Sequence, residues 1–143
     1  MDGNFVYGNE KGGLLNAALK SLGAVQKGGA SEIASFLDYG ERIKEQGLSL
    51  MNGPGNDLES MTGIVAGGAN IILFSTGMGA TEGNLIAPVI KISSTTGLFQ
   101  RMDEDMDFDA GPVIEAAASL DKLSVSLADF MVEVASGRRT SSE

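Results

Sequence analysis

Two short apolar runs restrict the fold of this chain more than any other feature. Residues 70–74 form one run, and residues 88–93 form the other, with glycine-rich sequence between them. Runs of this length that are apolar nearly throughout are typical of strands buried on both faces of a parallel sheet. We therefore predict an α/β protein with a three-layer, Rossmann-like and mostly parallel sheet flanked by helices.

A third strand and several helices follow from caps, turns and periodicity. Residues 48–51 are predicted to be a strand, and Asn56, with Glu59 three positions later, begins a helix that ends near Gly67. A helix is also predicted over residues 31–47, with Ser31 as its cap, Gly47 as its end, and an apolar face made of Ile33, Phe36, Leu37 and Ile43. The other predicted helices cover residues 14–22, a short segment from Thr95 or Thr96 to Met102, and a long segment from Pro112 to Gly137.

The length of 143 residues suits one domain. We predict a single α/β domain over residues 1–137 that begins with a glycine-rich segment over residues 1–30. Residues 138–143 are expected to be a flexible tail.

Composition removes several classes of function. The sequence has no His, Cys or Trp, which excludes a His–Cys zinc site, a disulfide and a Ser-His-Asp triad built from this chain alone. A net charge of −9 without a basic cluster argues against nucleic acid as a partner. The start of the chain resembles no signal peptide, and the longest apolar stretch, residues 64–74, is too short to span a bilayer, so we expect a soluble, cytoplasmic protein with no membrane contact.

Ligands of open α/β sheets bind beyond the carboxyl ends of the strands, which directs attention to three loops. The loops after the predicted strands are rich in small polar residues, and their candidates for contact with a substrate are Asn56, Thr76, Gly77, Gly79 and Ser93. The alternative is that these loops are only tight turns that require glycine. Lys91 interrupts an apolar strand, where a cation needs a partner or a substrate anion, although a plain surface position is also open for it.

An acidic run at residues 103–109 offers oxygen ligands for a divalent cation. Asp107 and Asp109 alternate around Phe108 and are the candidates for metal ligands. The alternative, a solvated turn ahead of the helix at Pro112, is favoured for residues 103–105.

Several blocks, in order along the chain, resemble the C-terminal domain of the altronate and D-galactarate (sugar-acid) dehydratases. They are residues 8–13 (GNEKGG), 20–29 (KSLGAVQKGG), 53–57 (GPGND), 69–79 (ANIILFSTGMG) and 88–93 (PVIKIS), followed by Arg101 and Met102 and by 107–111 (DFDAG). The resemblance covers nearly the whole chain and extends to sulfolactate sulfo-lyase large subunits. It adds Asn9, Lys11 and Ser21 to the candidates for substrate binding.

The resemblance implies a hydro-lyase that converts a sugar acid to a 2-keto-3-deoxy sugar acid. A base removes the proton α to the carboxylate, a divalent metal, Fe²⁺ or Mn²⁺, stabilises the enediolate, and the β-hydroxyl leaves as water. A lysine acts as a base near neutral pH only where burial or a nearby cation lowers its pKa, and Lys20 is our candidate for that catalytic role, with Lys91 as the partner of the carboxylate.

The family's enzymes also carry an N-terminal domain and a central domain, so the resemblance implies partners within the same enzyme and an isolated chain that is inactive. Members usually have an arginine where this chain has Met78, and a Thr-Thr pair and a glutamate near residues 15–18. These departures favour the alternative, a non-catalytic sugar-acid-binding or assembly module with a drifted site. A free-standing enzyme that uses only lysines and carboxylates, and a homo-oligomer, are left open.

Overall fold

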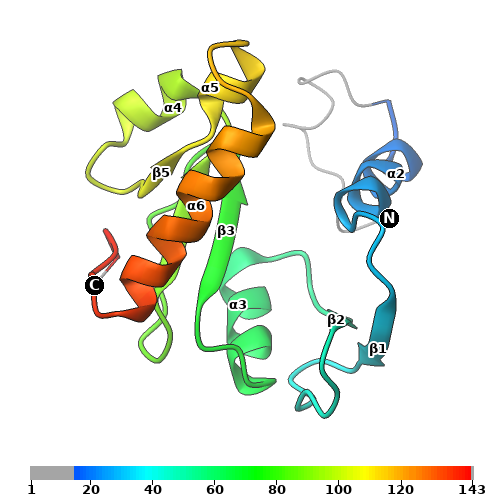
Figure 1. Ribbon diagram of the computed structural model, residues 1–143. Helices are drawn as coiled ribbons and strands as arrows, with labels where there is room; N and C mark the ends of the chain where they lie inside the picture. The colour runs from blue at the N-terminus through cyan, green and yellow to red at the C-terminus, as the bar shows by residue number, and fades with distance from the viewer. Residues whose placement is uncertain (1–14, 143) are drawn as a thin grey trace. The chain divides into compact units, whose positions relative to one another are not determined.

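The computed structural model describes residues 15–142, and these residues form an α/β protein in which every strand pairing is parallel (Figure 1). In chain order the elements are α2 Ala17–Lys27, β1 Ile33–Leu37, β2 Leu48–Met51, α3 Asp57–Ala66, β3 Ile72–Thr76, β4 Val89–Ser93, α4 Thr96–Arg101, β5 Phe108–Asp109, α5 Gly111–Ile114 and α6 Leu120–Ala135. The predicted fold class is confirmed.

The strands of the described residues form two small sheets instead of the single sheet expected. One sheet contains β1 and β2, and the other has the order β3-β4-β5. Contacts divide the chain into two compact units between Gly67 and Gly68, so that each unit has one sheet. The prediction of one domain over residues 1–137 stays a prediction.

The cap residues explain where the helices begin. The side chain of Asn56 accepts a hydrogen bond from the backbone N–H of Glu59 at the start of α3, and the Thr95 hydroxyl accepts one from the N–H of Leu98 at the start of α4. Each bond satisfies one of the N–H groups that a helix leaves unpaired at its first turn. The predicted helices at these two positions, and the predicted strands at 48–51 and 88–93, are therefore confirmed.

The predicted helix over residues 31–47 is wrong. Residues Ile33–Leu37 form β1, whose partner is β2, and the Ser35 and Ser49 hydroxyls lie 2.8 Å apart across the two strands. After β1 the chain turns, with the N–H of Glu41 bonded to the carbonyl of Asp38 and Gly40 at φ +73°. A left-handed residue at this point prevents a continuous helix.

Three other boundaries differ from the prediction. The helix expected at residues 14–22 is α2 at Ala17–Lys27. The strand expected at 70–74 is β3 at Ile72–Thr76, so that two polar residues belong to its end. The long helix expected from Pro112 is divided into α5 and α6, because Ala116 adopts φ +54° between them and the Ser119 side chain caps a new helix. A positive φ at a non-glycine residue interrupts helical geometry.

The core of the second unit depends on β4, which pairs with a strand on each side and is buried at all five residues. Ile90 and Ile92 pack with Val134 of α6. Residues packed around them are Ile71, Phe108, Ala110, Leu127, Phe130 and Met131. Figure 1 shows α6 running along the sheet, and Leu127, Phe130, Met131 and Val134 are the α6 residues that pack on this core.

The C-terminal residues that the structure describes, 138–142, pack against this unit, whereas the sequence led us to expect a flexible tail there. Thr140 is 5% exposed, and both the N–H and the hydroxyl of Ser141 donate to Asp107 at the start of β5. The Arg138 guanidinium lies 4.2 Å from the ring centroid of Phe130, a cation–π contact. None of the helices described here combines the length and apolarity needed to cross a membrane.

The close approach of two loops should make Gly111 intolerant of a side chain. A Cβ at Gly111 would lie 2.0 Å from the backbone nitrogen of Thr96, whereas a Cβ at Gly97 would meet nothing closer than 4.0 Å. We expect Gly111→Ala to lower the free energy of unfolding by about 2–4 kcal/mol. Gly97→Ala, inside α4, should be neutral or stabilising by up to about 1 kcal/mol. Urea unfolding of both variants checks this, and equal stabilities would contradict it.

Candidate functional site

The predicted site residues fall into three groups. Asn9 and Lys11 lie outside the described residues. Lys20 and Ser21 lie on α2, but their side chains are outside the described part of the chain, so their roles stay predictions. Asn56 is described, and its side-chain oxygen caps α3 in the first unit. The remaining candidates all belong to the second unit and gather at its sheet.

The register of the second sheet places three polar residues in one row. Thr76 is paired with Ser93, and Ser93 is paired with Asp109, across β3, β4 and β5. Paired residues of a parallel sheet project to the same face, and alternate residues of a strand share a face. Lys91 therefore lies on the same face as Ser93, opposite the face on which Ile90 and Ile92 pack against α6.

Thr76 organises the turn that follows β3. Its hydroxyl accepts hydrogen bonds from the N–H groups of Met78 and Gly79, at 3.2 and 3.1 Å. Gly79 has φ +95°, and a Cβ there would lie 2.1 Å from the sulfur of Met102, so only glycine fits without strain. A Cβ at Gly77 would be 3.5 Å from the Ser94 hydroxyl, which is an ordinary contact. The glycine requirement of a tight turn thus applies to Gly79.

Ser93 and Asp109 join the loops that follow β4 and β5. The fully buried Ser93 hydroxyl donates to the carbonyl of Thr95 at 3.0 Å and lies 3.5 Å from Asp109 Oδ1. The same Asp109 oxygen accepts from the N–H of Gly111 at 2.9 Å. These bonds hold the loops at the carboxyl edge of the sheet in a defined arrangement, which is the property a binding site needs from its scaffold.

Lys91 is the most unusual residue of this face. Its side chain is 0% exposed, and no hydrogen-bond partner for its Nζ is found among the described residues. A buried ammonium without a partner is costly, since buried charges are normally paired. Thr96, just beyond the end of β4, has a hydroxyl oxygen that is likewise buried without a partner in the described part of the chain. Sequence reasoning named Lys91 as a site candidate but gave Thr96 only as a possible start of a short helix, and the signal available for Thr96 was its place soon after a buried strand.

Asp107 has a structural role in the fold. Its backbone N–H donates to the carbonyl of Lys91 at 2.9 Å, and its Oδ2 accepts from the backbone N–H of Lys91 at 2.8 Å. Its Oδ1 accepts two bonds from Ser141, at 2.7 and 2.8 Å. The carboxylate thus completes the hydrogen bonding of β4 where β5 begins and ties the C-terminal residues to the sheet.

The described residues do not by themselves fit the divalent metal that the sequence led us to expect. Both oxygens of Asp107 accept hydrogen bonds from the chain itself, and Asp109 Oδ1 is bonded to Gly111. No group of three or more acidic residues that could hold a metal ion occurs within residues 15–142. Hard cations require about six oxygen ligands, so an ion here would depend on ligands from elsewhere. Ligation by Asp107 and Asp109 stays a prediction, and no catalytic step is routed through a metal.

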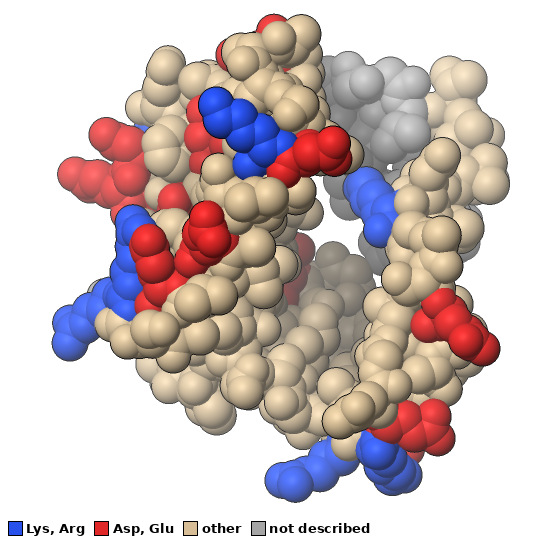
Figure 2. Space-filling view, in the orientation of Figure 1, with Lys and Arg blue, Asp and Glu red and all other residues tan. Residues whose placement is uncertain are grey.

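Surface charge offers no obvious alternative to Lys91 as an anion site on the visible face. Figure 2 shows Lys and Arg side chains in small groups, most of them beside Asp or Glu side chains. Exposed cations of this kind bind anions weakly because water and salt screen them. The buried Lys91 would act on an anion with far less screening.

Parallel strands with ordered polar loops at their carboxyl ends define this chain as an α/β protein, a class in which ligands are commonly bound at that edge. Comparison with known proteins assigns it more closely. The family described as D-galactarate/altronate dehydratase, C-terminal, matches residues 1–143, and the chain belongs to this family.

Three relatives show the extent of the similarity. Altronate dehydratase of Escherichia coli K12 is 38% identical over 136 residues, which is 95% of this chain and 27% of that protein. Galactarate dehydratase (L-threo-forming) of the same organism is 36% identical over 132 residues, 92% of this chain and 25% of that protein. The (2R)-sulfolactate sulfo-lyase subunit beta of Chromohalobacter salexigens is 32% identical over 137 residues, 95% of this chain and 35% of that protein. The chain thus spans about a quarter to a third of the length of these relatives.

The two roles considered for Asp107 predict opposite behaviour without metal. Asp107→Ala would leave the N–H groups of Lys91 and Ser141 without an acceptor, so we expect a loss of about 2–3 kcal/mol of stability in buffer containing EDTA. Asp103→Ala, at an exposed acid of the same run, should change stability by less than about 0.5 kcal/mol. Chemical denaturation measures both. An Asp107→Ala protein as stable as the original in EDTA would contradict the structural role.

Proposed function

We propose that this chain is the part of a sugar-acid hydro-lyase that helps to bind an altronate- or galactarate-type substrate on its way to a 2-keto-3-deoxy sugar acid. Family membership and the 36–38% identity to altronate and galactarate dehydratases support the proposal. Because the chain spans only about a quarter of those enzymes, we propose that other domains are needed for turnover. A cytoplasmic location is part of the same proposal.

The observation that carries the proposal is the buried Lys91 ammonium, for which no partner is found among the described residues. A sugar acid has a carboxylate that would pair with this cation in a site of low dielectric constant. The row formed by Thr76, Ser93 and Asp109 lies on the same face, beside the carboxyl ends of the strands. Hydroxyl-rich substrates suit such surroundings, since hydroxyls both donate and accept hydrogen bonds.

In this proposal Lys91 contributes to the first chemical step by electrostatics. Removing the proton α to a carboxylate places further negative charge on the carboxylate oxygens, and a cation fixed beside them stabilises that charge. The electron pair of the broken C–H bond then expels the β-hydroxyl, which takes a proton from solvent and leaves as water, and the enol that remains tautomerises to the 2-keto acid. Lys20 remains the proposed base that accepts the α proton.

The alternative proposal is a non-catalytic sugar-acid-binding or assembly module. The hydroxyls of Thr76 and Ser93 are already engaged in hydrogen bonds within the chain, which favours a structural use of these loops. Met78, at the position where the resemblance leads us to expect an arginine, is 83% exposed and supplies no charge. Binding of a sugar acid separates the first proposal from an assembly module, and turnover in the presence of the other domains separates it from a non-catalytic binding module.

The full chain should bind sugar acids without converting them. We expect calorimetric titration with galactarate or altronate to give measurable binding, since Lys91 offers one strong anion contact, while 2-keto acid formation stays at background. Galactitol, the alditol that lacks both carboxylates of galactarate, is the matched ligand and should not bind at Lys91. The absence of binding heat with both acids would favour the assembly module. Formation of keto acid by the isolated chain would refute the need for other domains.

Replacement of Lys91 should separate its cost to folding from its use in binding. Lys91→Met keeps the length of the side chain and removes the buried charge, so we expect the ligand-free protein to gain about 1–3 kcal/mol of stability. The same variant should lose sugar-acid binding. Lys122→Met, at an exposed lysine of α6, is the control and should change neither property. Urea unfolding and calorimetry measure both, and unchanged binding in Lys91→Met would refute the role of Lys91.

A further inference from the structure

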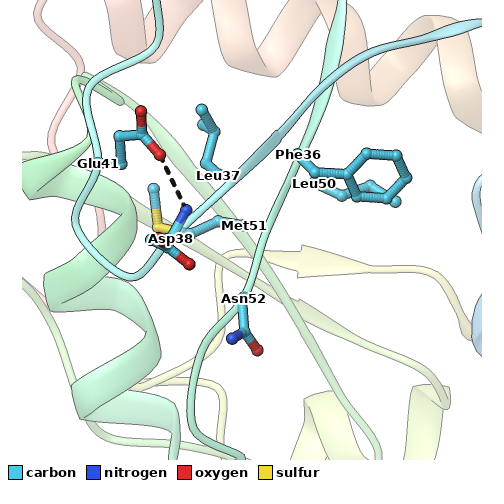
Figure 3. Close-up of a pocket in the computed structure, with 7 residues that line it drawn as sticks. All are labelled: Phe36, Leu37, Asp38, Glu41, Leu50, Met51 and Asn52. Carbon is cyan, nitrogen blue, oxygen red and sulfur yellow. Dashed lines mark hydrogen bonds between the residues drawn. The ribbon is translucent and has the colours of Figure 1, made fainter.

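The first unit contains a cavity that neither the sequence analysis nor the proposed function uses. It lies at the carboxyl ends of the parallel strands β1 and β2, with a volume of about 340 Å³ (Figure 3). Its lining residues are Phe36, Leu37, Asp38, Glu41, Leu50, Met51 and Asn52. The carboxyl edge of parallel strands is the usual place for a ligand in α/β proteins, and the volume is within the range of small-molecule sites.

Internal bonds fix one acid of this cavity and leave the other polar groups available. Glu41 Oε2 accepts from the N–H of Asp38 at 3.1 Å, drawn as the dashed line in Figure 3, and its Oε1 bonds the Lys44 ammonium at 3.1 Å. The Asp38 N–H and then Lys44 lower the pKa of Glu41. The Asp38 carboxylate and the Asn52 side-chain amide make no hydrogen bond to any residue that the structure describes. These two groups are therefore available to a ligand.

An apolar surface lies beside these polar groups. Phe36 and Leu50 are register partners on β1 and β2, and Figure 3 shows their side chains lying together. The Phe36 ring is 75% exposed, although faces of parallel sheets are normally covered. A cavity lined by an aromatic ring as well as an aspartate and an asparagine suits a ligand that has both C–H groups and hydroxyls.

The charge of the cavity selects among ligands. The Glu41 charge is already paired with Lys44, and the Asp38 carboxylate, which no described cation pairs, would repel a carboxylate or phosphate. A divalent cation would find few ligands, because both Glu41 oxygens are engaged and no metal-binding group of three acids occurs among residues 15–142. Neutral hydroxyls meet neither difficulty, since they donate to the Asp38 carboxylate and exchange hydrogen bonds with the Asn52 amide. We propose that this cavity is a binding site for a neutral polyol, such as a sugar or sugar alcohol, through Asp38, Asn52 and the Phe36 ring.

Residue-resolved NMR titration of the full chain tests this site separately from the Lys91 site. Galactitol is the neutral probe, and galactarate is its doubly charged counterpart. We expect galactitol to shift the backbone amide signals of Asp38 and Asn52 with a dissociation constant on the order of millimolar. Galactarate should leave these two signals unchanged, whatever it does near Lys91. Failure of the proposed function would appear only in the signals near Lys91, so the two results are independent.

Matched variants decide whether the polar groups carry the binding. Asp38→Ala should weaken galactitol binding about tenfold or more, because it removes a charged hydrogen-bond acceptor. Glu45→Ala removes the same charge from an exposed position outside the cavity lining and should leave binding unchanged. If Asp38→Ala does not fold, Asn52→Ala tests the same cavity and should weaken binding in the same direction. No galactitol shifts, equal shifts with galactarate, or shifts at these residues with Mg²⁺ alone would each overturn the proposal.

Discussion

The pairing of β4 on both of its edges is the interaction on which the second unit depends. A strand in this position is buried at every residue, so both of its faces must be compatible with an interior. Ile90 and Ile92 meet this requirement by packing against α6. Lys91 does not meet it, because its ammonium has no partner among the described residues. Because side chains alternate between the two faces of β4, its isoleucines build the hydrophobic core on one face. On the other face lies a cation without a partner among the described residues.

The elements that the sequence predicted correctly are those determined by neighbours in the chain. Caps such as Asn56 and Thr95 act three residues away, and the apolar run at 88–93 needs no partner to be recognised. The helix predicted at 31–47 failed because Ile33, Phe36 and Leu37 have a spacing that a helix face and a short strand can both show. Pairing with β2 decides between the two, and that contact is between residues 14 or more positions apart.

The residues of the candidate site also differ in whether near neighbours in the chain or distant ones determine their role. Thr76, Lys91 and Ser93 could be named as candidates because loops after buried strands, and a cation within one such strand, are visible in the sequence. The structural role of Asp107 could not be predicted from the sequence, because its carboxylate accepts a hydrogen bond from Ser141, which is 34 positions away. The acidic cavity was missed for a related reason. Asp38 follows β1 directly, but the erroneous helix hid the end of that strand and therefore the edge at which a ligand would be sought.

A buried cation with no partner among the described residues would tie ligand binding to stability. Any anion that pairs with Lys91 in the folded chain, and not in the unfolded chain, stabilises the fold by RT ln(1 + [L]/Kd). At a ligand concentration about a hundred times Kd this amounts to about 2.7 kcal/mol, which is comparable to the cost expected for an unpaired buried polar group. The folded state would then carry the cost of Lys91 when empty and recover it when occupied. In the proposed function an anionic substrate would offset the cost of burying Lys91 in the central strand, whereas the hydroxyls around it already bond within the chain.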